Sequence, residues 1–402
     1  MEVSDFEIPY YSSDVLRRWK RREGCKVIAG LDISFLRSPP DCKFHVTPPP
    51  PSPPVEKADR AIEFLDGLQK VHDFFTEPPK ERAPAPPKPQ VEQIRIPPFD
   101  LQEIPGAMRA VNMPIAAKLM ERWFAGAINY SPTDADEDKL INQDGKPYPP
   151  SMYEMSIIKL EWVLKFVRAR KAYEQLLSRD TLTRPRALDV LRNKLEPYRK
   201  PDRQMFPLVA CDNSLPVLHK HFQFQYSSVE SSMSQKIAQY LHQDYVNRGL
   251  PDDLTGALGS FNFYAAPGHV EYSWDGSHAY IHDVVVYIKD NYTFGDKPGE
   301  VSQYLGHWNH GGVIIVPYDA ALSALDWHAR PVGDILALDG NHKLYVELPV
   351  AVGDPRKRDS VFYPIYNSTY RKWQIAHKHG GDFVIFSDYE TIDLKTPIMV
   401  KF

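Results

Sequence analysis

The sequence predicts an α+β protein in which an N-terminal Pro-rich arm and a helical middle region precede a C-terminal, largely antiparallel sheet with a few short helices. Prolines cluster at 48–54 and 77–89, apolar residues recur at helical spacing through the middle of the chain, and alternating strand patterns dominate its last part. We therefore expect an extended arm with short helices over 1–93, a helical region over 94–205 and an α+β domain over 206–402.

Composition limits the classes of function. The 402 residues carry 48 basic and 52 acidic side chains, so the net charge of −4 does not favour nucleic acid as a partner. Three widely spaced cysteines form neither a disulfide framework nor a metal clip, which fits a reducing cytosol. The first ten residues lack an apolar signal core, and no apolar run approaches the ~18 residues that span a bilayer. We expect a protein that is cytoplasmic in the producing cell, without a transmembrane segment, and secreted only by a route that needs no signal peptide.

Clusters of proline predict the structure of the arm, and the spacing of apolar residues predicts the helices that follow it. Proline fixes φ and removes a donor, so the Pro-rich segments are expected as semi-rigid spacers around one short helix at 55–75. The acidic stretch 133–138 resembles a calcium loop without completing its pattern, so a solvated loop is expected there. Further helices are expected at 104–109, from Pro114 to Phe124, at 151–178 and at 188–195.

The α+β domain is expected to begin with a strand in 206–224, where alternation puts His219 and His221 on one face. Two histidines at i and i+2 suit a metal only if a third ligand arrives from elsewhere, and a half-exposed strand is the simpler interpretation. Asp275 and Gly276 form a strong hairpin signal. Later strands are expected at 256–266, 269–274, 278–289, 313–316, 343–352, 361–366, 382–388 and 398–401, with helices at 229–247, 319–325 and 367–379.

A polar connection at 290–312 separates two apolar strands and is the first candidate site. Long connections inside compact domains are usually functional. Twelve of the fourteen histidines lie at or beyond His219, so titratable chemistry is concentrated in this part of the chain. A histidine base oriented by an aspartate would be the expected chemistry. The predicted catalytic residues are Asp290, Tyr292, Asp296 and His307, with Trp308 and His310 in support.

A second polar segment follows the strand at 361–366. It supplies four further supporting residues, namely Arg371, Trp373, His377 and His379. Both segments combine Trp with His and end in Gly-Gly, so we expect 290–312 to pack on 368–379, with His307 or Trp308 close to Trp373 or His377. The competing interpretation is that the tryptophans fill the core and the glycines only turn the chain.

The stretches IPGAMRAVNMPIAAKLMERWFAG, DNYTFGD…SQYLGHWN and YRKWQIAHKHGGDFVIFSD resemble a family of uncharacterised proteobacterial proteins, a domain of unknown function found near type VI secretion genes. The resemblance covers roughly residues 95–402. It implies a secreted antibacterial effector, or a non-catalytic adaptor or structural module of the delivery system. The partners that it implies are a secretion-spike component or a cognate immunity protein, and the oligomeric state stays open.

A fainter resemblance concerns mechanism. Gly259-Ser260-Phe261, Asp275-Gly276 and Asp290-Asn-Tyr292 are similar, in that order, to colicin M-like toxins, which cleave a phosphoester of lipid II with Mg²⁺. Thr293 stands where that family has a second aspartate, and His307-Trp308 stands where it has His-Arg. The resemblance implies a cell-envelope hydrolase in which Asp296 replaces the missing carboxylate.

Overall fold

The computed structural model describes residues 33–41, 98–229, 252–296, 302–314 and 357–402, together with the backbone of short strands in 6–27 and 349–352. These residues belong to one compact unit formed by 1–45 and 93–402. The helices expected at 55–75 and 319–325 lie outside the described residues, as does the helix expected at 229–247 apart from Val229. No described helix combines the length and the apolar character needed to cross a bilayer.

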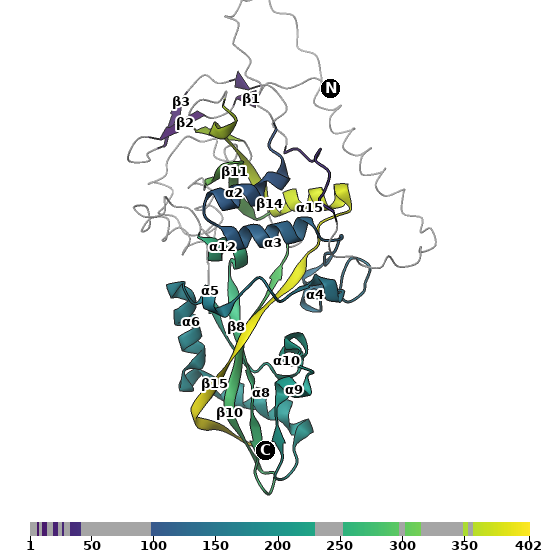
Figure 1. Cartoon of the computed structure of the whole chain (residues 1–402), viewed down its shortest axis with the longest axis vertical. Helices are drawn as coiled ribbons and strands as arrows, with labels where there is room; N and C mark the ends of the chain where they lie inside the picture. Colours follow the sequence, from purple (N-terminus) through teal and green to yellow (C-terminus); the bar gives the residue numbers. More distant parts are fainter. Residues whose placement is uncertain are drawn as a thin grey trace, which may run out of the picture. The chain divides into compact units, whose positions relative to one another are not determined.

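The described residues build a seven-stranded sheet around two long antiparallel strands that run side by side (Figure 1). Within this seven-stranded sheet, β15 and β5 form the one parallel pair. The expected α+β fold with a largely antiparallel sheet is therefore confirmed. The Asp275-Gly276 turn joins β9 to β10 as predicted, with Gly276 at a φ of 69°. In spatial order the strands are β5 (Tyr153–Glu154), β15 (Phe383–Lys401), β10 (His278–Tyr292), β8 (Phe261–Pro267) and β7 (Gln225–Val229). In addition, β9 (Val270–Tyr272) pairs with β10, and β6 (Gln204–Met205) pairs with β9.

A second sheet contains part of the segment that was expected to be a loop. Residues 304–309 form β11, which pairs with β14 on one edge and with β12 on the other. The prediction of an irregular connection over 290–312 was therefore wrong, because these polar residues satisfy their backbone in a ladder. The order is β12 (Gly312–Ile314), β11 (Tyr304–Asn309), β14 (Val361–Tyr366), β13 (Val350–Val352), β2 (Tyr10–Ser13) and β3 (Trp19–Arg22), and β1 (Phe6–Glu7) pairs with β4 (Lys26–Val27).

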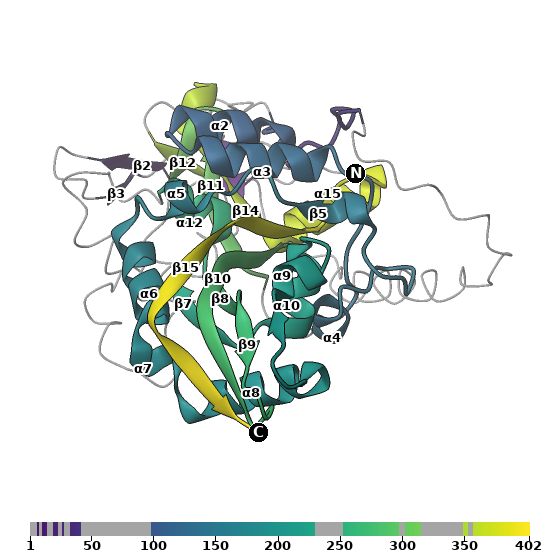
Figure 2. The ribbon, with the colours of Figure 1, turned by 60° about the horizontal axis from the view of Figure 1, so that its bottom comes forward.

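Helices α6 (Val167–Leu177) and α10 (Leu215–Phe222) cover opposite faces of the seven-stranded sheet (Figure 2). Tyr173 of α6 contacts Phe263 at 5.6 Å between ring centroids, and His219 of α10 contacts the next residue, Tyr264, at 4.7 Å. Because neighbouring residues of a strand point to opposite faces, the two helices lie on opposite sides.

The strand predicted within 206–224 was wrong. Pro216 lies in the first turn of α10, where a missing N–H does no harm, and Leu218 lies on the buried side of the helix. His219 packs against the sheet, whereas His221 is exposed, so the two histidines do not share a face.

The helix predicted over 151–178 is interrupted. The carboxylate of Glu154 accepts the backbone N–H groups of Ser156 and Ile157, and that of Asp388 accepts the N–H of Leu160. These side-chain acceptors replace the first helical hydrogen bonds. The segment folds as η2 (Pro150–Met152), β5, α5 (Leu160–Val163) and α6, followed by α7 (Arg179–Leu182), α8 (Pro185–Leu195) and η3 (Glu196–Tyr198).

Most of the remaining described helices lie near the second sheet and the upper end of β10, whereas α9 packs beside α10 (Figure 1). The predicted helices α2, α3, α8 and α15 are confirmed, but the acidic loop expected at 133–138 is the short helix α4, because the Thr133 side chain caps it. Asp253 caps α3 by accepting the N–H groups of Ile115 and Ala116. These elements are η1 (Leu101–Glu103), α2 (Ile104–Ala110), α3 (Pro114–Phe124), α4 (Asp134–Asp138), α9 (Pro207–Ala210), α12 (Asp253–Leu258), η4 (Arg358–Ser360) and α15 (Asn367–His377).

Candidate functional site

The four residues predicted as catalytic do not come together in one site: Asp290 and Tyr292 lie on β10, Asp296 follows that strand, and His307 lies in the second sheet. Asp290 is half-buried on β10, and Tyr292 is a core residue whose ring stacks on Phe383 at 4.9 Å. Asp296 is exposed in the connection after β10. His307 belongs to the other sheet, where its side chain is fully buried. Among these four residues, Asp290 is thus the partly exposed carboxylate on β10.

The supporting residues divide between the second sheet and α15. Trp308 donates its Nε1–H to the carbonyl of Leu305 at 2.9 Å, and His310 pairs with Asp359 at 3.0 Å. Trp373 is fully buried, with its ring centroid 4.6 Å from that of His377. Burial lowers the pKa of His379, and the carbonyl of Pro40 partly opposes that shift.

The expected packing of the connection after β10 on α15 is confirmed, but through other residues. Phe294 stacks on Tyr370 at 4.0 Å with an interplanar angle of 14°, and the Asn367 side-chain amide donates to the carbonyl of Gly295 at 3.0 Å. The described contacts of His307 and Trp308 lie within the second sheet instead.

The glycines after α15 also serve a different contact from the one expected. Gly380, with a φ of 88°, faces the ring of Trp123, and Gly381 faces the carbonyl of Ala127. Gly380 and Gly381 thus allow close approach to the end of α3 and to the residues that follow it, and not to Gly311 and Gly312.

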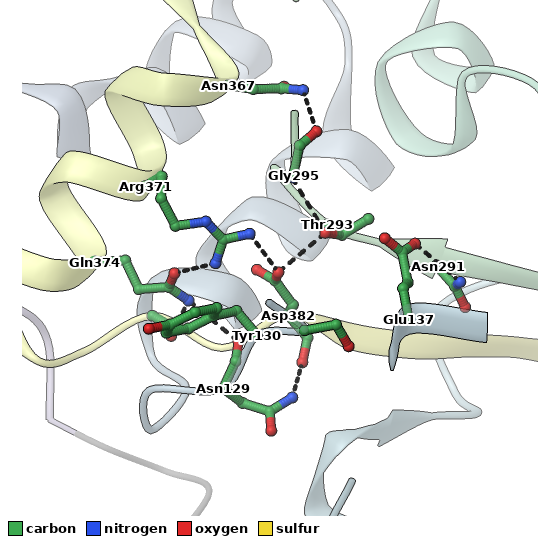
Figure 3. A network of polar contacts seen from close by, with 12 residues as sticks. Asn129, Tyr130, Glu137, Asn291, Thr293, Gly295, Asn367, Arg371, Gln374 and Asp382 are labelled. Carbon is green, nitrogen blue, oxygen red and sulfur yellow. Dashed lines mark hydrogen bonds and ion pairs between the residues drawn. The ribbon is translucent and has the colours of Figure 1, made fainter. Parts of the chain in front are cut away.

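The first polar cluster, which we call the Asp382 network, joins α15, α3 and the end of β10. Asp382 is 1% exposed, and its carboxylate accepts from Arg371 Nη2 at 3.0 Å, from Thr293 Oγ1 at 3.0 Å and from Trp123 Nε1 at 2.9 Å. Figure 3 shows the guanidinium and the Thr293 hydroxyl both directed at this carboxylate. Burial raises the pKa of Asp382, although Arg371 and the hydrogen bonds lower it.

Two amides complete the network. Asn129 Nδ2 donates to the Asp382 carbonyl at 2.6 Å, and Gln374 Nε2 donates to the Gly380 carbonyl at 2.8 Å. Arg371 also donates to the Gln374 side chain and lies over the Tyr130 ring at 4.6 Å. A core tolerates a buried charge when an ion pair and several hydrogen bonds satisfy it, and removing one partner is strongly destabilising.

The second cluster, which we call the tyrosine face, lies on the side of the seven-stranded sheet that α10 covers. An aromatic row crosses the strands, with centroid distances of 6.2 Å, 6.1 Å, 6.2 Å and 6.4 Å between successive rings. A polar row beside it contains Asn262 and Lys289, which are opposite each other on β8 and β10. Its aromatic residues, in order, are Tyr226, Tyr264, Tyr287, Phe386 and Tyr153.

Several titratable groups of the tyrosine face and its surroundings have shifted pKa values. Burial lowers the pKa of His219 to about 4 and also lowers that of Lys289. Burial raises the pKa of Asp290 to about 8 and raises that of Glu137, whose carboxylate accepts from Asn291 Nδ2 at 3.1 Å. Groups with shifted pKa values gather at functional sites more often than elsewhere.

The described side chains of the two clusters do not include a set of ligands for a metal ion. Among the residues that the structure describes, no group of three or more His, Cys, Asp or Glu side chains could hold a metal ion. His219 and His221 were considered as metal ligands on one strand face. They lie on the helix α10 instead, which directs the two side chains to different sides.

Residues 99–402 match a family of unknown function, DUF6402. The chain belongs to this family. No curated protein and no solved structure matches it. The Asp382 network and the tyrosine face of this DUF6402 protein both lie inside the matched residues.

The central residues of both clusters were not among the predicted site residues. Asp382 ended the polar segment after the helix at 367–379 and began a predicted strand, and Lys289 ended another predicted strand. One signal for the tyrosine face was present, because Asn262 and Tyr264 alternate with apolar residues, as do Tyr287 and Lys289. Such alternation on two strands predicts two polar-aromatic faces that can align in a sheet.

Proposed function

We propose that this protein is a non-catalytic module of a type VI secretion system that binds a toxin or a component of the secretion spike. The observation that carries the proposal is the Asp382 network. Its buried carboxylate already accepts hydrogen bonds from Arg371, Thr293 and Trp123, so it is engaged within the chain and not directed at a substrate. The scatter of the predicted catalytic residues supports a binding role as well, because Tyr292 packs in the core and His307 lies in the other sheet. The secretion context rests on the resemblance carried by residues 104–126 and by the segments around Tyr292 and Trp373.

An antibacterial effector acting on the cell envelope is the second candidate. Asp290 favours it, since a carboxyl with a pKa near 8 beside Lys289 and Glu137 suits acid–base chemistry. The residues do not fit a Mg²⁺ centre of the colicin M pattern, because Tyr292 packs in the core and Asp296 lies on an exposed connection. An effector of this type would also have a cognate immunity protein.

One experiment separates the two candidates. The full chain is exported to the periplasm of a sensitive bacterium, and the same tagged chain is recovered from a lysate of secretion-competent cells. A binding module leaves growth unchanged and co-purifies with a toxin or spike component. Growth arrest by the wild type that disappears in Asp290→Ala would overturn the binding module in favour of the effector. Recovery without any secretion component would also count against the module.

A further inference from the structure

The register of the sheet places the polar and aromatic side chains of the tyrosine face next to one another. Tyr264 is opposite Tyr226 on one side and Tyr287 on the other, while Asn262 is opposite Lys289. Directly opposed residues of an antiparallel ladder point to the same face. The face thus presents flat rings beside an ammonium group and an amide.

Part of this face is open to solvent. Tyr226 is 56% exposed, and Tyr264, Asn262 and Lys289 are each half-buried. His219 closes one side of the row, with its Nδ1 3.1 Å from the Tyr287 hydroxyl. The rings of Tyr287 and Phe386 are therefore buried, while those of Tyr226 and Tyr264 remain accessible to solvent.

Lys289 is a polar group of this face for which the described residues supply no hydrogen-bond partner. Within the described residues, no hydrogen bond or ion pair is found for its ammonium group, although Asp290 and Glu137 act on its charge. Burial lowers the pKa of Lys289, so its charged form is less favourable here than in bulk water. A ligand that supplies an acceptor would offset this cost.

The mixture of groups indicates the chemistry of that ligand. Flat tyrosine rings suit the C–H faces of a sugar, and ammonium, amide and carboxyl groups can donate to and accept from its hydroxyls. The positive charge of Lys289 is opposed by the carboxylates of Glu137 and Asp138 on α4, so the surroundings favour neither an anion nor a cation. We propose that the tyrosine face is a binding site for a neutral carbohydrate. The site is independent of whether the chain works as an adaptor or as an effector.

Isothermal titration calorimetry of the full chain tests the proposal with a panel of neutral tetrasaccharides: chitotetraose, cellotetraose, maltotetraose and xylotetraose. At least one is expected to bind saturably. Tyr226→Ala should weaken that binding by about three- to tenfold through loss of stacking. Tyr226→Phe, which keeps the ring, should stay within about twofold of the wild type. Lys289→Met should weaken it by about tenfold through loss of a charged donor.

The control is Trp274→Ala, since this side chain is 82% exposed at the turn after β9, outside the tyrosine face. It should bind as the wild type does. The exposed ring of Tyr226 can be removed without disturbing the core, so a loss of binding there reports on contact with the sugar. The proposal is overturned if no tetrasaccharide binds, or if binding survives both Tyr226→Ala and Lys289→Met.

Discussion

The Asp382 network and the tyrosine face lie close together along β10 but treat their charges in opposite ways. Asp382 is engaged by three donors from three different elements. Lys289, a few residues before Thr293 along the chain, has no such partner among the described residues. Paired buried groups hold a fold together, whereas unpaired ones persist where function requires them. The difference assigns a structural role to the first cluster and a binding role to the second.

The largest expected effect follows from breaking the Asp382 network. Asp382→Asn leaves the partly buried Arg371 guanidinium without its counter-charge, and should lower the free energy of unfolding by about 3–5 kcal/mol. Urea titration followed by circular dichroism measures it. Asp189→Asn is the matched control, because its ion pair with Arg192 is on the surface and should change stability by less than about 0.5 kcal/mol. Equal losses in the two variants would remove the structural role.

A backbone contact beside the network gives the next largest effect. A Cβ at Gly381 would lie 2.6 Å from the Ala127 carbonyl, so Gly381→Ala should destabilise the fold by about 1–3 kcal/mol. Gly106 lies exposed in α2 with no atom within 4 Å of its added Cβ. Gly106→Ala should therefore stabilise the protein by about 0.5–1 kcal/mol. Thermal unfolding compares the two, and a stabilising Gly381→Ala would contradict the close approach.

A pH-dependent effect is expected from Asp290, at the upper end of β10. Its pKa is about 8 in the folded chain and about 3.9 when unfolded, so between these values the folded state holds a proton that the unfolded state has lost. Stability should fall as pH rises through this window. Asp290→Asn should show a shallower fall in urea titrations at pH 5, 6.5 and 8. Asp296→Asn, at an exposed carboxylate, is the control and should follow the wild type.

Local patterns in the sequence predicted much of the fold. Pro114 at the first helical turn, the Asp275-Gly276 turn and the alternation around Phe263 all led to the observed elements. The failures occurred where contacts distant in sequence decide the local structure. The helix expected at 151–178 was predicted in one piece because the start of α5 depends on the carboxylate of Asp388, which lies far away in sequence.

The candidate site was harder to predict for the same reason. Asp290 could be identified from its place after an apolar run, but its neighbour Glu137 comes from α4, far away in sequence. Strand register decides that Lys289 faces Asn262, and a single sequence does not reveal register directly. His307 looked like a companion of Asp290, yet β11 carries it into another sheet.

The most direct measurement compares the stability of Lys289→Met with that of Asp382→Asn in the same urea titration. Lys289→Met removes a partly buried ammonium group that has no described hydrogen-bond acceptor, so it should leave the free energy of unfolding unchanged or raise it by up to about 1 kcal/mol. Asp382→Asn should lose several times that amount. A loss in Lys289→Met as large as that in Asp382→Asn would show that both charges hold the fold, and would contradict the division into a structural cluster and a binding face.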